Sequence, residues 1–396
     1  MATLSIRDLH LHGRRVFIRV DFNVPLKDGV ITDDTRIRAS LPTIEHALAY
    51  GALPIVASHL GRPRGEVNAK YTLAPVAERL TQLLGRRVVF ASDCIGDDVA
   101  RAIDEARQAN AVVLLENLRF HPEEEQNDAS FSKQLADVAD DYVDDAFGAA
   151  HRAHASVEGM THFFPRPAAG LLMEQELKYL GHVLEAPERP FVVILGGAKV
   201  SDKIELIHNM LGKVNRLIIG GAMAYTFLKS RGVPTGKSLV EDDKLDDARA
   251  ISAEAAAKGV ELALPIDHVV TDRIAADAAH AVLAIDDPAI GARMGVDIGP
   301  KTVAKYGALV GDAQTVVWNG PMGVFEVPAF AGGTNALARA VAGVHGTTII
   351  GGGDSISAIK QSGMADRITH ISTGGGASLE FLGGRTLPGV AALANK

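Results

Sequence analysis

The chain has 396 residues, of which 47% are hydrophobic and 22% charged, and its formal net charge is -8. A chain of this length is too long to fold around a single hydrophobic core, so two domains of roughly 150–200 residues each are predicted. The acidic balance argues against extensive nucleic-acid binding, but it leaves room for a local basic pocket that takes a small anion.

The N-terminal segment and the cysteine content indicate a protein of a reducing compartment. No apolar stretch of the signal-peptide kind opens the sequence, and no run of about 18 apolar residues could span a membrane. Cys94 is the single cysteine, so no intramolecular disulfide can form. We expect a cytoplasmic protein in which Cys94 is a packing or surface residue.

Short apolar, β-branched runs alternate with helical patterns through the first half of the chain. Near-continuous apolar strands of this kind are typical of a parallel sheet covered by helices on both faces. The predicted strands are Val16–Val20, Leu53–Ala57, Val88–Phe90, Val112–Leu115 and Tyr142–Val143.

A boundary between two domains is expected near residues 165–190. Two prolines precede a helical pattern over Leu171–Leu184, and Pro187 and Pro190 end it. We interpret this helix as the element that joins the lobes; a helix inside one domain is the alternative.

The second half repeats the alternation of strands and helices, with a plain surface helix expected over Ala250–Lys258. Two such series predict two doubly wound α/β domains with parallel sheets. The strands of this half are Phe191–Leu195, Leu217–Ile219, Val316–Trp318, Thr348–Ile350 and His370–Ser372.

Cations and polar side chains follow the predicted strands of the first half, where open α/β sheets bind ligands. Guanidinium groups suit carboxylate and phosphate, so arginines at several strand ends predict one anion pocket, with surface ion pairs as the alternative for each arginine alone. Arg36 is expected in a turn nearby. The strand-end residues are Arg19, Asp21, Asn23, His59, Arg62, Arg119, His121, His151, Arg152 and His154.

Glycine clusters follow the strands of the second half instead. They let backbone N–H groups approach a phosphate, although tight packing of strand on helix explains any one cluster equally well. We infer that the first lobe holds a small acidic metabolite and the second a nucleotide, with closure of the lobes before transfer. The clusters are Gly196–Gly197, Gly220–Gly221, Asn319–Pro321, Gly351–Gly353 and Gly374–Gly376.

Several familiar motifs are absent or incomplete. The segment GVPTGKS at residues 232–238 is not a P-loop, because Arg231 stands where the first glycine is needed. No GxGxxG with a following acid supports a dinucleotide dehydrogenase, and no HRD or DFG set supports a protein kinase. His151 and His154 lack a third metal ligand and suit anion binding or packing better.

Taken together and in order, the strand-end motifs resemble those of phosphoglycerate kinase. They run from residue 16 to residue 382 and read RVDFNVP, DDTRIRAS, SHLGRP, LLENLRFH, DAFGAAHRAHAS, GGAKVSDKI, VWNGPMGVFE, GGGDS and STGGGASLEFL. The resemblance implies a monomeric glycolytic enzyme with two Rossmann-like domains, joined by a helix and hinge, at residues 1–170 and 171–385. About residues 386–396 are expected to pack back on the first domain.

The resemblance also implies the reaction: reversible phosphoryl transfer from 1,3-bisphosphoglycerate to ADP with Mg²⁺, giving 3-phosphoglycerate and ATP. Arg36, Lys199 and Gly375 would be catalytic. By the same match, 3-phosphoglycerate would be held by Asp21, Asn23, Arg36, His59, Arg62, Arg119 and Arg152. The nucleotide would be held by Gly197, Ala198, Lys203, Asn319, Glu326, Gly352, Gly353, Asp354 and Ser355, with Asp354 also holding the metal.

Two positions depart from the family pattern, which commonly has threonine where Ala149 and Ser355 stand. Ser355 keeps a hydroxyl, whereas Ala149 loses one and any substrate contact made through it.

Three alternatives remain open on the sequence: a kinase acting on another carboxylate, a non-catalytic binding protein on the same fold, and a nicotinamide dehydrogenase. Nucleic-acid and membrane partners are not expected.

Overall fold

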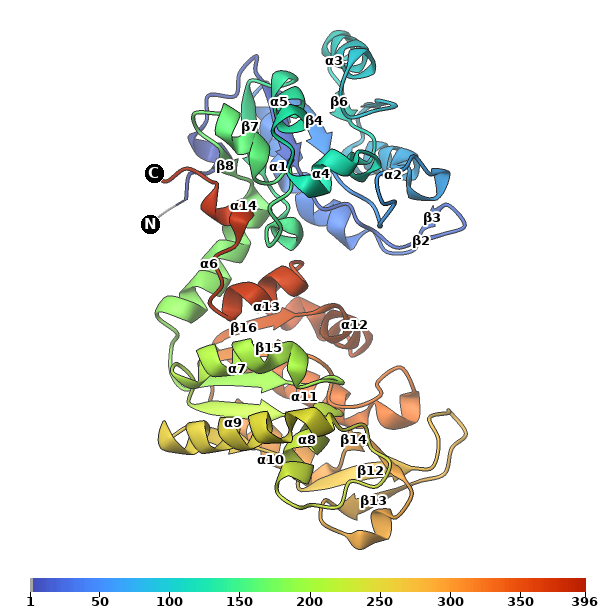
Figure 1. Cartoon of the computed structure of the whole chain (residues 1–396), viewed down its shortest axis with the longest axis vertical. Helices are drawn as coiled ribbons and strands as arrows, with labels where there is room; N and C mark the ends of the chain where they lie inside the picture. Colours follow the sequence, from blue (N-terminus) through green and yellow to red (C-terminus); the bar gives the residue numbers. More distant parts are fainter. Residues whose placement is uncertain (1–2) are drawn as a thin grey trace. The chain divides into compact units, whose positions relative to one another are not determined.

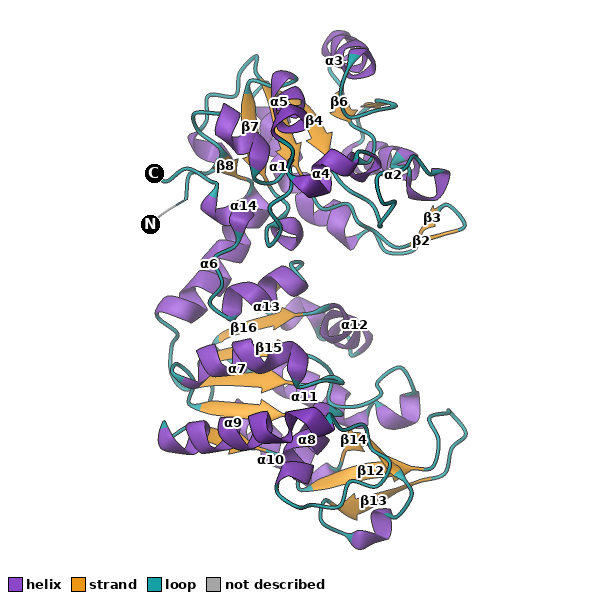
Figure 2. Ribbon diagram, viewed as in Figure 1, coloured by secondary structure: helices purple, strands orange, loops and turns teal. Residues whose placement is uncertain are grey.

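The structure, a computed structural model, describes residues 3–396, which divide into two compact units. Unit 1 comprises the chain up to Lys178 together with Thr386–Lys396, and unit 2 comprises Tyr179–Arg385 (Figure 1). Each unit contains a sheet with helices packed around it (Figure 2). Within the described residues, no helix combines the length and the apolar character that a membrane crossing requires.

The sheet of unit 1 has six parallel strands in the order β5-β6-β4-β1-β7-β8. Phe17 of the central strand lies between Ile55 and Tyr142 of its neighbours, and all three are fully buried. Burial of both faces explains why these strands read as continuous apolar runs. The strands are β1 (Arg15–Arg19), β4 (Leu53–Ala57), β5 (Val88–Phe90), β6 (Val112–Leu114), β7 (Asp141–Asp144) and β8 (Ala168–Ala169).

Helical segments connect these parallel strands, and a short hairpin follows β1. The hairpin strands, β2 (Leu26–Lys27) and β3 (Val30–Ile31), were not predicted because two residues carry no periodicity. The helices of unit 1 are α1 (Thr35–Ala49), α2 (Ala74–Leu84), α3 (Asp97–Ala109), α4 (Pro122–Gln126) and α5 (Ala129–Asp137).

The segment Thr386–Lys396 packs within unit 1. It contains the short helix α14 (Pro388–Ala391), and its backbone pairs with distant parts of that unit. The N–H of Leu4 donates to Ala394 O at 2.7 Å, and the N–H of Ala394 donates to Pro167 O at 2.8 Å. These bonds tie the last residues to the edge of the unit 1 sheet.

The sheet of unit 2 also has six parallel strands, in the order β11-β10-β9-β15-β16-β17. Trp318 of β15 is the largest fully buried side chain, and its indole N–H donates to Gly320 O at 2.7 Å. The strands are β9 (Phe191–Leu195), β10 (Arg216–Ile219), β11 (Glu261–Ala263), β15 (Thr315–Asn319), β16 (Thr347–Gly351) and β17 (His370–Ile371). The predicted α/β class with parallel sheets is therefore confirmed.

Helices alternate with the strands of unit 2 as well. The predicted surface helix over Ala250–Lys258 is the C-terminal part of a longer helix, α9. The helices are α7 (Ile204–Leu211), α8 (Met223–Ser230), α9 (Leu245–Ala257), α10 (Pro300–Gly311), α11 (Gly332–Ala342), α12 (Gly353–Gln361) and α13 (Gly376–Leu382).

A second, antiparallel sheet in unit 2 was not predicted. Its strand order is β13-β12-β14, with β12 (Asp267–Thr271) pairing with β13 (His280–Ala284) and β14 (Met294–Ile298). In β13 the side chains alternate between exposed and half-buried positions, so its sequence lacks the continuous apolar run that marks the parallel strands.

The helix α6 (Leu171–Glu185) agrees with the predicted helix to within one residue, and the division between the units falls inside it, after Lys178. Unit 1 anchors its first turn. Asp145 Oδ1 accepts the N–H of Leu172 at 2.9 Å and of Met173 at 3.2 Å, which satisfies two donors that a helix start leaves free.

Candidate functional site

The predicted anion-binding residues of unit 1 lie at one edge of its sheet. Most of them follow β1, β4, β6 and β7, whose carboxyl ends meet at this edge because the strands are parallel. Arg36 was predicted to lie in a loop turn between elements. It lies instead in the first helical turn of α1. Asp33 accepts the N–H of Thr35 at 2.8 Å, which supports the helix start there.

Hydrogen bonds join three of these residues. Arg36 Nη1 donates to Asp21 Oδ2 at 2.7 Å, and Asp21 Oδ1 accepts the backbone N–H of Asn23 at 3.1 Å. The Arg36 side chain remains 34% exposed, so part of the guanidinium is open to a ligand. The aspartate holds the cation in position and leaves further donors free.

Gly61 links the loop after β4 to two other elements of the site. Its N–H donates to Asn23 Oδ1 at 2.9 Å, and its carbonyl accepts Arg119 Nη1 at 2.8 Å. Burial lowers the pKa of Arg119 to about 10, which still leaves it cationic at pH 7. The exposed Arg62 follows directly in this loop. Gly61 itself was not singled out in the sequence.

Two buried histidines report how closely the cations gather. Burial, followed by the charges of Arg19, Arg119 and Arg36, holds the pKa of His59 well below its usual range. Burial and then the charge of Arg119 lower the pKa of His154 to about 3; Arg19 and Arg152 also contribute. Both imidazoles are therefore neutral at pH 7, and their surroundings carry a concentrated positive charge.

Several predicted residues of this edge also make contacts within unit 1. Arg19 is fully buried, where it donates to Ser156 Oγ at 2.7 Å and to His59 Nδ1 at 3.2 Å. His121 pairs with Asp93, and Arg152 Nε donates to His151 Nε2 at 3.1 Å. Ala149 is also buried and packs with apolar neighbours. Position at a strand end therefore does not by itself give a side chain access to a ligand.

Unit 2 contains a pocket of about 270 Å³ at the carboxyl ends of its parallel strands. This volume lies near the lower end of the range for small-molecule sites, about 300–1,000 Å³. The pocket brings together four predicted residues, which are Gly197, Ala198, Glu326 and Asp354.

The antiparallel sheet supplies one wall of this pocket, and sequence reasoning missed it. His268 of β12 and Asp297 of β14 line the pocket beside Tyr225 of α8. Tyr225 Oη and His268 Nδ1 lie 2.9 Å apart, and burial lowers the pKa of His268 to about 4. Burial also raises the pKa of Asp297 to about 7. No sequence motif marks these positions, because the three residues are far apart in the sequence and only the fold brings them together.

The glycine clusters of unit 2 divide into two kinds. A Cβ on Gly196 would lie 2.1 Å from the carbonyl oxygen of Pro321, so this glycine is needed for close backbone packing. Gly197 has φ of +97° and no atom within 4 Å of such a Cβ, so it leaves open space beside the pocket. Packing thus explains part of a pattern that the sequence assigned to nucleotide binding.

A buried hydrogen-bond chain lies beside the pocket. Lys203 donates to Asn319 Oδ1, and Asn319 Nδ2 donates to Gly351 O at 2.8 Å, which joins the ends of β15 and β16. Burial lowers the pKa of Lys203 to about 8, and the charges of Asp202 and Asp354 oppose that shift. Lys203 is therefore still mostly cationic at pH 7.

Lys199 is exposed on the loop after β9. Glu241 fixes the chain beyond it by accepting the N–H of Val200 at 2.6 Å and of Ser201 at 3.1 Å. These two hydrogen bonds fix the backbone that follows Lys199, while the Lys199 side chain itself is exposed.

The remaining predicted glycines lie at the N-terminal ends of two helices, α12 and α13. Gly352 caps α12 with φ of +92°, Gly353 begins it, and Asp354 is exposed in its first turn. Ser355 Oγ accepts the N–H of Gly320, so its oxygen is engaged within unit 2. Gly375 caps α13 with φ of +54°.

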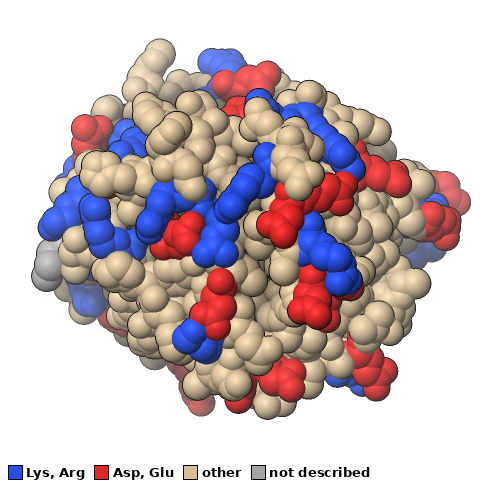
Figure 3. Space-filling view, turned by 90° about the horizontal axis from the view of Figure 1, so that it is seen from above, with Lys and Arg blue, Asp and Glu red and all other residues tan. Residues whose placement is uncertain are grey.

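Charged side chains of both signs are interspersed over the face of the molecule in Figure 3. In unit 1 many surface cations are paired, as in Arg14–Asp141 at 2.8 Å and Arg15–Asp140 at 2.7 Å. Such pairs were the alternative that the sequence left open for each single arginine. The cations around His59 and His154 differ from them because they gather at one edge of the sheet.

Comparison with known proteins identifies the family. A family model described as phosphoglycerate kinase matches residues 6–385. The phosphoglycerate kinases of Acidobacterium capsulatum and Moorella thermoacetica are 58% identical over 405 residues and 57% identical over 396 residues, with 100% of each chain covered. The structure of phosphoglycerate kinase from Coxiella burnetii matches with a TM-score of 0.88 and 41% identity over 98% of both chains. The chain belongs to the phosphoglycerate kinase family.

Proposed function

We propose that this protein catalyses the reversible transfer of a phosphoryl group from 1,3-bisphosphoglycerate to ADP, giving 3-phosphoglycerate and ATP. Family membership makes it a phosphotransferase of glycolysis that uses ATP and ADP as substrates. The observation that carries the assignment is the gathering of cations around two neutral histidines in a chain that matches the family over nearly its whole length.

Unit 1 is assigned the 3-phosphoglycerate portion. This ligand carries a carboxylate and a phosphate, and guanidinium groups bind both through paired hydrogen bonds. Asp21, which holds Arg36, and Asn23, which holds Gly61, would keep the donors in place before the ligand arrives. The binding set is Asp21, Asn23, Arg36, His59, Arg62, Arg119 and Arg152.

Unit 2 is assigned the nucleotide. Gly197 and Ala198 would lie against the adenine, and Glu326 would accept hydrogen bonds from the ribose hydroxyls. Lys203 would neutralise phosphate charge, and Asn319 would hold that lysine beside the nucleotide. The start of α12, with Gly352 and Gly353, would face the phosphates, and Ser355 would support it through the hydrogen bond that its Oγ accepts from Gly320.

Asp354 fits the role of a Mg²⁺ ligand. It is an exposed carboxylate that lines the pocket. Mg²⁺ bound to nucleotide normally takes one or two protein carboxylates along with phosphate oxygens and water, so one such aspartate is sufficient. The ion would neutralise charge on the nucleotide phosphates, and Asp354 would fix the orientation of that complex.

The reaction needs no general base from the protein. The acceptor in the reverse direction is a carboxylate with a pKa near 4, which is already ionised at pH 7. Catalysis is then positioning and stabilisation of charge on the transferring group. Arg36, Lys199 and the backbone N–H groups at Gly375 would supply donors from different sides. A monomeric enzyme in the cytoplasm is part of the same proposal.

The first test measures ATP consumption with Mg²⁺, with and without 3-phosphoglycerate, coupled to a dehydrogenase that removes the acyl phosphate. We expect turnover only when ATP, Mg²⁺ and 3-phosphoglycerate are all present. Omission of each component in turn is the control. A folded protein that binds ATP but gives no turnover with 3-phosphoglycerate would contradict the substrate assignment, and a panel of other carboxylic acids would then identify the acceptor.

A further inference from the structure

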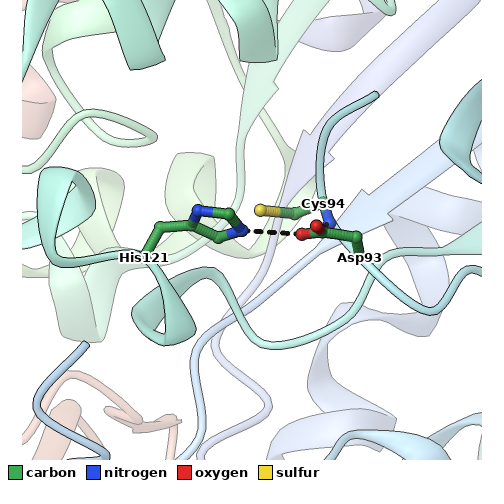
Figure 4. A group of neighbouring side chains, drawn as sticks. All are labelled: Asp93, Cys94 and His121. Atoms are coloured by element: carbon green, nitrogen blue, oxygen red, sulfur yellow. Dashed lines mark hydrogen bonds and ion pairs between the residues drawn. The ribbon is translucent and has the colours of Figure 1, made fainter. Parts of the chain in front are cut away.

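Three side chains with the donor atoms of a transition-metal site lie together in unit 1. Asp93, Cys94 and His121 each offer one ligand atom, and these atoms all lie within 4.8 Å of one another. His121 Nε2 and Asp93 Oδ1 are 2.7 Å apart. In Figure 4 the sulfur of Cys94 and the carboxylate of Asp93 both point toward the imidazole of His121.

Local structure fixes these three groups. Asp93 and Cys94 lie in the loop between β5 and α3, where the N–H of Cys94 donates to Asp93 Oδ1 at 2.6 Å. His121 precedes α4, and its ring stacks on the buried Phe131 with centroids 5.1 Å apart. The stacking orients the imidazole, and the loop carries the other two ligands to it.

The cluster is open on one side. Cys94 is buried, whereas the side chains of Asp93 and His121 are 44% and 26% exposed. An ion can therefore reach the cluster from solvent, and water can complete its coordination. Burial raises the pKa of the Cys94 thiol well above its usual range, so a bound ion would have to displace the thiol proton and stabilise the thiolate itself.

We propose that Asp93, Cys94 and His121 bind a borderline-soft divalent transition metal, of the Zn²⁺ type, with one coordination position left to water. Thiolate, imidazole and carboxylate are the ligands of zinc sites, and three protein ligands with an open position are a known zinc arrangement. Mg²⁺ prefers oxygen ligands alone, so this site is distinct from the proposed Mg²⁺–nucleotide site.

The geometry needs only a small adjustment. Tetrahedral zinc with bonds of 2.0–2.3 Å separates its ligand atoms by about 3.3–3.7 Å. The imidazole and carboxylate would move apart from their 2.7 Å contact, and the sulfur would come closer. The half-exposed Asp93 would make most of this movement and give up its hydrogen bond from the Cys94 N–H, whereas His121 and Cys94 are held by packing.

The ion would join two segments of unit 1 that the chain brings together from a distance. One is the loop after β5, and the other contains Arg119, two residues before His121. Metal binding would therefore stabilise the folded unit 1, by an amount that grows with the logarithm of metal concentration.

Cobalt(II) is the probe, because Cys94 is the only cysteine in the chain and a thiolate-to-cobalt charge-transfer band can arise only there. The full-length protein is titrated with Co²⁺ without nucleotide, and near-ultraviolet and visible absorption are recorded. We expect the charge-transfer band with visible bands of tetrahedral cobalt, and removal of both by excess Zn²⁺ but not by excess Mg²⁺.

Variants separate the cluster from adventitious binding. Cys94→Ser should abolish the charge-transfer band, and His121→Asn should raise the Co²⁺ dissociation constant at least about tenfold. His162→Asn is the matched control, since His162 also pairs with a carboxylate, Glu158, at 2.7 Å but lies away from any thiol. Absence of the band in the folded parent protein, or an unchanged midpoint in His121→Asn, would overturn the proposal.

Discussion

At the scale of single residues, His59 and His154 show how burial sets the charge of the anion site. Both lie among arginines, and burial together with those cations keeps them neutral at pH 7. The arginines therefore carry the positive charge, while the imidazoles act as neutral hydrogen-bonding groups. Arg19 donates to His59 Nδ1, which leaves Nε2 of that ring to carry the proton.

Arg62→Ala should weaken binding of 3-phosphoglycerate. Arg62 is exposed and its charge is free for a ligand, and a hydrogen bond to a charged group contributes about 1.5–3 kcal/mol. We expect KM for 3-phosphoglycerate to rise about 10- to 100-fold with little change in kcat. Steady-state kinetics check this, with Arg101→Ala on the outer surface of α3 as the control. An unchanged KM would remove Arg62 from the site.

Lys199→Ala should act on turnover rather than on nucleotide binding. A cation that stabilises charge on the transferring group is needed most in the transition state, so its loss should lower kcat about 10²-fold or more. The control is Lys258→Ala, which removes an exposed lysine of the same unit that pairs with Glu254. Kinetics at saturating substrates and an ATP-binding titration distinguish the two effects. Near-normal turnover in Lys199→Ala would exclude it from the mechanism.

At the scale of elements, the start of α6 combines a structural and an electrostatic role. Asp145 accepts two N–H groups of this helix through Oδ1, while its Oδ2 has no hydrogen-bond partner among the described residues. Burial raises its pKa to about 8, so the carboxyl group is largely protonated at pH 7. The neutral form keeps the acceptor that the helix needs without burying a charge.

Asp145→Asn should remove a contribution to stability that falls as the pH rises. In the unfolded chain an aspartate has a pKa near 3.9, so between about pH 4 and pH 8 only the folded state binds this proton. The contribution of this carboxyl group to the free energy of unfolding should therefore fall as the pH rises through this interval. Asparagine cannot ionise and keeps the Oδ1 acceptor.

Urea unfolding at several pH values measures this effect, with Asp104→Asn on the exposed face of α3 as the control. Asp144, whose pKa burial raises to about 7, contributes in the same direction in both proteins, so the difference between the two slopes isolates Asp145. An identical slope in Asp145→Asn and in the parent protein would contradict the assignment.

The sequence predicts ten of the twelve described parallel strands, missing β8 and β11, and none of the antiparallel sheet. Strands buried on both faces, such as β4 and β9, must be apolar throughout, and their observed bounds equal those expected from the sequence. The strands β13 and β14 are partly exposed, and the mostly buried β12 carries the polar residues Asp267, His268 and Thr271, so none of the three shows a continuous apolar run. Arg36, which was expected in a turn, lies instead in the first turn of α1.

The candidate site is predictable to a similar degree. The order of the motifs predicts one nucleotide site that includes Gly197, Ala198, Glu326 and Asp354. The pocket of unit 2 is lined by all four residues. His268 and Asp297 are not predictable, because long-range packing alone brings them to the pocket. The roles of the individual site residues remain predictions that the variants above address.

At the scale of the whole molecule, the proposed function divides the two substrates between the units. A phosphoryl group can pass between them only when both are bound in one reactive complex from which water is excluded. On this proposal the reaction would depend on both units at once, although each has its own core.

Binding of both ligands together should make the molecule more compact. Small-angle X-ray scattering measures the radius of gyration of the free protein, of the protein with 3-phosphoglycerate or Mg²⁺–ATP alone, and of the protein with both. We expect the smallest value in the last case, because only then do both units have a ligand to enclose. Equal values in all four samples would argue against closure as a step of the reaction.

The placement of Thr386–Lys396 within unit 1 has a consequence for how the protein is made. These residues are synthesised after all of unit 2, yet their backbone bonds to Leu4 and Pro167 complete the first unit. During translation, these hydrogen bonds of unit 1 can therefore form only after the whole of unit 2 has been synthesised. The order of translation thus differs from the order of assembly, and a nascent chain halted before residue 386 would expose an unfinished edge of unit 1 to chaperones.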